Sequence, residues 1–182
     1  MSNNKKFLWG VATSAFQIEG NIENDMTRWE REGKFRRDGK NPIYKSGVDH
    51  WNRWEADFRM LQELNVNAYR FSIEWARIEP EPGKIAIAAL DRYDRMIDRL
   101  LEYGITPMLT LHHFTHPIWF HKISPWHKSN SIEIFGRFVD LAAARFGDRV
   151  KLFVTFNEPL VWLLAGYGDG KFPPGEKNVK KM

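Results

Sequence analysis

The 182-residue chain contains no cysteine, which excludes disulfide bonds and thiolate metal sites. It has no apolar run near the length needed to span a membrane, and its start lacks the continuous hydrophobic core and the cleavage site of a signal peptide. No Gly-rich phosphate-binding loop follows the first predicted strand, because Gly10 stands alone. We therefore expect a cytoplasmic protein that holds no dinucleotide, no other cofactor and no metal, and that has no membrane partner.

The excess of positive over negative charge is also small. The formal net charge is +4, and Lys and Arg are scattered apart from the pairs Arg36-Arg37 and Lys180-Lys181. A nucleic-acid-binding protein is expected to gather its basic residues in a patch or stripe. The charges are therefore interpreted as solvated surface, and no nucleic-acid partner is expected.

Aromatic residues, in contrast, are abundant: the chain has eight Trp, thirteen Phe and five Tyr. Some of these must belong to the core of a domain whose composition is 43% hydrophobic. An excess of Trp also suits sugar binding, because the apolar face of a pyranose packs on a flat ring while the indole N–H can donate a hydrogen bond.

Four short apolar runs predict strands, and three helical stripes lie between them. The strands are predicted at Phe7–Thr13, Val66–Ile73, Thr106–His112 and from Leu152 to the Asn157-Glu158 pair. The stripes are Trp51, Trp54, Phe58, Leu61; Leu90, Tyr93, Ile97, Leu100, Leu101; and Ile132, Phe135, Val139, Ala142, Phe146. Asp49 is expected to cap the first helix, and Asn130 with Glu133 resembles a capping box for the third. Residues 21–48 and 113–128 are predicted to be loops.

This alternation indicates βα units and a parallel sheet, with helix formation starting again at Pro159. Polar and aromatic residues suited to chemistry follow the strands rather than precede them: Gln17, Glu19, Glu74, Trp75, His113, Trp119, Asn157 and Glu158. A one-sided distribution of this kind favours a (β/α)-barrel over a doubly wound sheet.

Three stretches carry a resemblance to a known family: 7–20 (FLWGVATSAFQIEG), 69–78 (YRFSIEWARI) and 155–159 (TFNEP). In this order they resemble the N-terminal part of a family-one glycoside hydrolase, the family of β-glucosidases, β-galactosidases and 6-phospho-β-glycosidases. The resemblance implies a retaining β-glycosidase acting on β-D-glucosides or related sugars. It also implies that residues 1–182 form the N-terminal half, about four βα units, of a (β/α)8 TIM barrel.

The resemblance assigns expected roles residue by residue. It implies that Glu158 is the catalytic acid/base and that Arg70 lies beside the nucleophile. The expected substrate-binding residues are Gln17, His113, Asn157, which would hold the sugar 2-hydroxyl, and Trp119, which would line the pocket. The sequence departs from the family at Phe114-Thr115-His116, where many members have Trp-Asp-Leu, and this leaves the sugar preference open.

The family's nucleophile is a second Glu in a Thr-Glu-Asn-Gly stretch, and no such tetrad occurs here. The C-terminal half of the barrel is absent from this chain, so a second chain or self-association is expected to complete it. The alternative is a non-catalytic half-barrel that associates or binds sugars or flat apolar ligands weakly.

Several residues keep a second interpretation. Glu158 can be a helix N-cap or a first-turn acid. Glu19 and Glu74 are the candidates for a second carboxylate, although a structural role is expected for both. Arg70 can be a satisfied buried cation. His112, His113 and His116 invite a metal site, but no carboxylate or cysteine accompanies them at ligand spacing.

Overall fold

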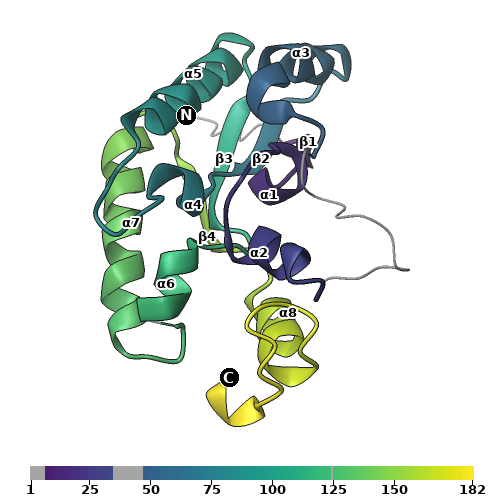
Figure 1. Cartoon of the computed structure of the whole chain (residues 1–182). Helices are drawn as coiled ribbons and strands as arrows, with labels where there is room; N and C mark the ends of the chain where they lie inside the picture. The colour runs from purple at the N-terminus through teal and green to yellow at the C-terminus, as the bar shows by residue number, and fades with distance from the viewer. Residues whose placement is uncertain (1–6, 35–46, 124) are drawn as a thin grey trace.

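The computed structural model describes residues 7–34, 47–123 and 125–182 (Figure 1). Four strands alternate with helices along the chain. The elements are β1 (Gly10–Ala12), α1 (Ala15–Ile18), α2 (Asp25–Arg31), α3 (His50–Glu63), β2 (Ala68–Ser72), α4 (Trp75–Ile78), α5 (Ile87–Glu102), β3 (Thr106–His112), α6 (Ile118–Ile123), α7 (Asn130–Phe146), β4 (Leu152–Phe156), α8 (Pro159–Leu163), a π-helical turn (Leu164–Gly168) and a 3₁₀ turn (Val179–Lys181).

All four strands are parallel and lie in the order β1-β2-β3-β4. Their register sets Arg70 of β2 between Ala12 of β1 and Met108 of β3, and it pairs His112 with Phe156 of β4. Each connection between neighbouring strands contains one long helix, α3, α5 or α7. Parallel crossovers are right-handed, so successive connections in one direction place their helices on the same face of the sheet. Figure 1 shows α5 and α7 running along one side of the strands.

One hydrophobic core fills the space between these helices and the sheet. Its largest fully buried side chains come from α3, α4, α5, α6 and α7, and Trp75 at the start of α4 is 1% exposed. The Trp75 ring stacks on Phe138 at 5.1 Å, and its N–H donates to Glu79 at 2.8 Å. The abundant aromatic residues thus serve first to pack helices on a sheet.

The inner and outer strands differ in exposure. β2 and β3 are almost entirely buried, whereas all three residues of β1 are exposed and β4 alternates between exposed and partly buried residues. Val11 and Phe153 are 36% and 37% exposed. Among the described residues, neither β1 nor β4 has a second neighbouring strand, so both edges of the sheet are open.

The predicted third strand, Thr106–His112, is confirmed to the residue, and the predicted first and second strands are shorter than expected. The two predicted loops are partly wrong, because α2 lies within residues 21–48 and α6 within 113–128; residues 35–46 and 124 of these loops lie outside the described residues. α2 is held by a capping box in which Asn24 and Thr27 bond reciprocally. The sequence signal was weak because this box has Thr, and not Glu or Gln, at its fourth position.

Two predicted caps are also wrong. Asp49 precedes α3 in a left-handed conformation (φ 58°) and makes no side-chain cap; it accepts a bond from the Asn52 side chain instead, at 2.8 Å. Asn130 is the first residue of α7, whose N-cap position is Ser129. Of the predicted apolar stripes, Leu101 (41% exposed) and Ile132 (78% exposed) point away from the core.

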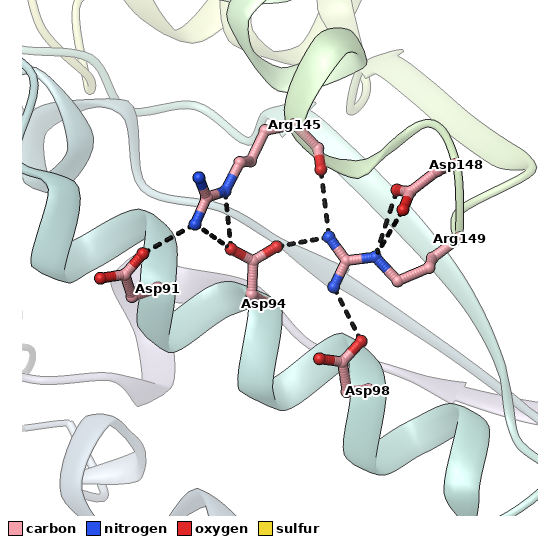
Figure 2. A network of polar contacts seen from close by, with 6 residues as sticks. All are labelled: Asp91, Asp94, Asp98, Arg145, Asp148 and Arg149. Carbon is pink, nitrogen blue, oxygen red and sulfur yellow. Dashed lines mark hydrogen bonds and ion pairs between the residues drawn. The ribbon is translucent and has the colours of Figure 1, made fainter.

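A network of ion pairs ties α5 to α7 on the surface (Figure 2). Asp94 lies between the two arginines: it accepts from Arg145 Nε at 2.6 Å and from Arg149 Nη2 at 2.5 Å. Asp91 and Asp98, one turn to either side on α5, bind the same two guanidinium groups at 2.7 Å each. The network fixes the relative position of the two helices that flank β3.

Candidate active site

Glu158 stands at the junction of β4 and α8. β4 ends at Phe156, and Pro159 is the first residue of α8, as the sequence predicts. Glu158 has left-handed backbone angles (φ 44°, ψ 59°), which are uncommon for a residue with a side chain. It occupies the N-cap position but makes no side-chain capping bond, and its carboxylate has no hydrogen-bond partner in the described part of the chain. The alternative interpretation is therefore correct for the N-cap position of Glu158, where the dipole of α8 favours an acid, but the side chain forms no capping bond.

Asn157 fixes the backbone beside Glu158. It is 7% exposed, and its N–H donates to the carbonyl of His112 at 2.9 Å, which continues the β3–β4 ladder past the end of the strands. Its side chain borders a cavity of about 170 Å³ whose other walls are His112, Trp126, Phe156, Pro159, Trp162 and Leu163. The cavity gives the strand end an apolar, aromatic floor.

His113 and Arg70 form the second part of the site. Burial lowers the pKa of His113 to about 4, and the positive charge of Arg70 adds to this effect, so the imidazole is neutral near pH 7. Its Nδ1 is buried without a partner among the described residues. Arg70 likewise has no side-chain hydrogen bond or ion pair there, so the alternative of a satisfied cation is not met within the described residues.

Gln17 and Trp119 are placed differently. Gln17 is exposed on α1 and accepts a bond from the Ser14 hydroxyl at 2.7 Å, which orients its amide. Trp119 is partly buried in α6, edge-on to Trp75 at 5.7 Å, and its N–H donates to the carbonyl of Glu79 at 2.8 Å. The N–H of Trp119 is therefore already engaged and is not available to a ligand in this arrangement.

The two other carboxylates are buried and bonded, as expected for structural groups. Glu19 (2% exposed) accepts from the Tyr93 hydroxyl at 2.7 Å and from Arg77 at 3.0 Å. Glu74 (1% exposed) accepts from the Thr115 hydroxyl at 2.9 Å. Burial, reinforced by the nearby Glu19, raises the pKa of Glu74 to about 7.

Sequence reasoning missed Asp25, which joins the first loop to the third. Its side chain accepts from the His116 N–H at 2.9 Å, while its own N–H donates to the His116 carbonyl at 3.2 Å. Burial raises the pKa of Asp25 well above its ordinary value. No local pattern marks such a pair, because the residues are 91 positions apart.

The histidines do not assemble a metal site in the described ranges. No group of three or more His, Asp or Glu side chains suited to a metal ion occurs there. The rings of His112 and His116 are stacked with centroids 5.9 Å apart, and burial lowers the pKa of His112 to about 3 and that of His116 well below its ordinary value. Within the same ranges, no helix is long and apolar enough to cross a bilayer.

The sequence profile of Glycosyl hydrolase family 1 matches residues 2–182. The chain belongs to this family. It is 39% identical over 178 residues to β-glucosidase A of Thermotoga maritima, and the match covers 95% of this chain and 40% of the relative.

Solved structures of the family agree. A β-glycosidase from Pyrococcus horikoshii is 40% identical and superposes with a TM-score of 0.87, over 96% of this chain and 40% of that one. The β-glucosidase from Thermotoga maritima in complex with deoxynojirimycin is 36% identical, with a TM-score of 0.88, over 96% of this chain and 41% of that one. The chain thus spans about 40% of the length of these relatives, and its four βα units correspond to the N-terminal half of their (β/α)8 barrel.

Proposed function

We propose that this chain supplies the acid/base and part of the glycone site of a retaining β-glycosidase, and that a second part of the barrel supplies the nucleophile. The observation that carries the proposal is the position of Glu158. Its carboxylate has no protein partner in the described chain and follows Asn157 at the carboxyl end of a parallel strand, where barrel enzymes keep their chemistry. The family's β-glucosidases support a β-glucoside as substrate.

Retaining hydrolysis uses two carboxyl groups about 5–5.5 Å apart. Glu158 would protonate the glycosidic oxygen as it leaves and would then remove a proton from the attacking water. The second carboxylate attacks the anomeric carbon and is displaced by that water. Glu19 and Glu74 are both buried in hydrogen bonds, so neither is suited to this role.

The surrounding residues fit the same proposal. Arg70 is a partly buried cation without a counterion in the described chain, which suits a carboxylate contributed by the rest of the barrel. A neutral His113 can donate to a sugar hydroxyl, and Asn157 and Gln17 carry amides that donate and accept. Trp119 would act by packing beneath the pocket.

The open edges of β1 and β4 support a partner. Exposed edges with apolar residues such as Val11 and Phe153 favour pairing with further strands. The partner would be a second chain that carries the remaining strands, or another copy of this chain. In the second case two half-barrels would pair with each other, and the pair would be non-catalytic because neither copy carries the nucleophile.

The test uses a joined enzyme, in which this chain is fused to the C-terminal part of Thermotoga maritima β-glucosidase A that it does not cover. We expect turnover of cellobiose and of a nitrophenyl β-glucoside, binding of deoxynojirimycin, and no turnover by the 182-residue chain alone. Glu158→Gln should lower cellobiose turnover roughly 10²–10⁴-fold, because the proton donor is lost.

The nitrophenyl substrate provides a sharper readout for Glu158→Gln. Its activated leaving group needs little protonation, so the loss should fall on the second step, where water needs a base. Azide needs no base and should restore turnover by forming a glycosyl azide. Glu133→Gln, the same change on an exposed site of α7, is the matched control. Cellobiose turnover that survives Glu158→Gln would refute the assignment.

A further inference from the structure

We propose that Asp25 and Glu74 are positioning residues: together they hold the turn from His113 to His116, and so set the orientation in which His113 meets the sugar. The inference rests on the proposed function for the role of His113. It assigns a task to two buried carboxylates that the hydrolytic mechanism itself does not use.

The first clamp is reciprocal. Asp25 Oδ1 accepts from the His116 N–H at 2.9 Å, and the Asp25 N–H donates to the His116 carbonyl at 3.2 Å. Both residues are buried, with exposures of 6% and 2%. Asp25 is itself fixed, because it is the first residue of α2 and follows Asn24, whose capping box with Thr27 ties down the start of that helix.

The second clamp acts one residue earlier. The Thr115 hydroxyl donates to Glu74 Oε2 at 2.9 Å. Glu74 cannot swing away easily, since its own N–H donates to the Tyr93 hydroxyl at 3.0 Å, and that hydroxyl donates to Glu19 at 2.7 Å. The loops after β1, β2 and β3 therefore converge on Thr115 and His116.

The turn between the strand and the clamps needs this support. Phe114 has φ 72°, a left-handed conformation that is strained for a bulky residue and persists only where its surroundings impose it. On the other side of His113, the His112 carbonyl is fixed by the Asn157 N–H at 2.9 Å. His113 thus lies between two anchored points, and release of the distal one lets its side chain leave the productive orientation.

The experiment compares paired variants of the joined enzyme. Asp25→Ala removes the side-chain bond of the first clamp and leaves its backbone bond, and Thr115→Val removes the second clamp. Asp25→Asn keeps an oxygen for the His116 N–H, and Thr115→Ser keeps a donor for Glu74. We expect the first two to raise KM about tenfold with a smaller change in kcat, as for the loss of one hydrogen bond to bound sugar. Asp25→Asn and Thr115→Ser should keep most of the wild-type affinity.

Leu100→Ala is the control for general destabilisation. Leu100 is fully buried near the C-terminal end of α5 and carries no polar side-chain group that could bond the three loops, so its loss should lower the melting temperature and leave KM unchanged. Amide hydrogen exchange over residues 113–116 provides a readout without turnover. Asp25→Ala and Thr115→Val should accelerate it, whereas Leu100→Ala should not do so selectively.

The outcomes separate the two proposals. A joined enzyme that binds deoxynojirimycin but does not turn over contradicts the proposed function, and deoxynojirimycin affinity then replaces KM in the comparison. Unchanged exchange over 113–116 in both clamp variants overturns the positioning role. The positioning role is also overturned if Leu100→Ala loses as much affinity as the clamp variants. The same holds if Asp25→Asn and Thr115→Ser lose as much affinity as Asp25→Ala and Thr115→Val.

Discussion

The two inner strands of this sheet are more deeply buried than the two outer strands. β2 and β3 are buried: Leu109 of β3 is fully enclosed, and so is Ile97 of α5, which belongs to the same core. β1 and β4 carry the same kind of short apolar sequence, yet their residues are exposed or only partly buried. The difference follows from neighbours and not from composition, because in the described part of the chain each inner strand has a strand on both sides and each outer strand has a strand on one side.

The polar side chains of the site differ in the same way: some have bonding partners within the described chain and others have none. The residues with complete bonding, such as Glu19 and Glu74, lie among the three loops that the chain closes by itself. The residues without partners in the described chain, Glu158 and Arg70, are those expected to face the missing half. The hydrogen bonds of these buried carboxylates are thus made within the described chain, whereas the proposed reaction needs the other half.

The largest expected effect tests how tightly the hydrophobic core against the inner strands is packed. Trp75→Ala in the joined enzyme should lower the free energy of unfolding by about 3–5 kcal/mol, because a fully buried aromatic side chain leaves a cavity. Ile132→Ala, at a 78% exposed position, should change it by less than about 0.5 kcal/mol. Urea unfolding measures both. Similar values for the two variants would contradict the described core.

The next effect tests the burial of Glu74. Its pKa of about 7 lies above the ordinary 4.5, so the folded state binds the proton more tightly and loses stability as pH rises between these values. Glu74→Gln keeps an oxygen for Thr115 and removes the titration. The stability of wild type relative to Glu74→Gln should therefore fall by up to about 3 kcal/mol between pH 4.5 and 7.

Urea unfolding of the two proteins across this pH range gives the measurement. The buried His112 and His113, with lowered pKa values, act in the opposite direction: their contribution is lost as pH falls below 6.5. Because they occur in both proteins, they cancel in the difference. A difference that stays constant with pH would show that Glu74 is hydrated.

The smallest effect concerns the surface between α5 and α7 (Figure 2). Arg149→Ala breaks the contacts to Asp94 and Asp98, and we expect a loss of about 1 kcal/mol that shrinks at high salt, as for a partly exposed network. Arg99→Ala, in an exposed pair with Glu102, should have no measurable effect. Equal losses in thermal unfolding would mean that the network adds nothing beyond single pairs.

Much of this architecture could be predicted from local sequence. The long helices follow their apolar stripes, and β3 follows an apolar run that begins with a Pro, where a strand tolerates it. α2 and α6 were missed because seven and six residues give too little periodicity to detect. Leu101 and Ile132 lie at the borders of their stripes, where apolar type alone does not decide burial.

The site was predictable to a lesser degree. The strand-end position of Glu158 could be read from β4 and Pro159, and a structural role for Glu19 and Glu74 is confirmed by their bonds. The clamp between Asp25 and His116 could not be predicted, since it depends on how two loops 91 residues apart meet in space. The hydrogen bond from the Trp119 N–H to the Glu79 carbonyl could not be predicted for the same reason, because it joins residues that are far apart in the sequence.

The most direct test of this account is amide hydrogen exchange of the four strands, measured in the isolated chain and in the joined enzyme. Completion of the barrel should slow exchange most at the open edges, β1 (Gly10–Ala12) and β4 (Leu152–Phe156), and should change β2 and β3 far less. Slowing that is equal in all four strands, or absent from β1 and β4 in an active joined enzyme, would contradict the claim that these two edges are where the halves meet.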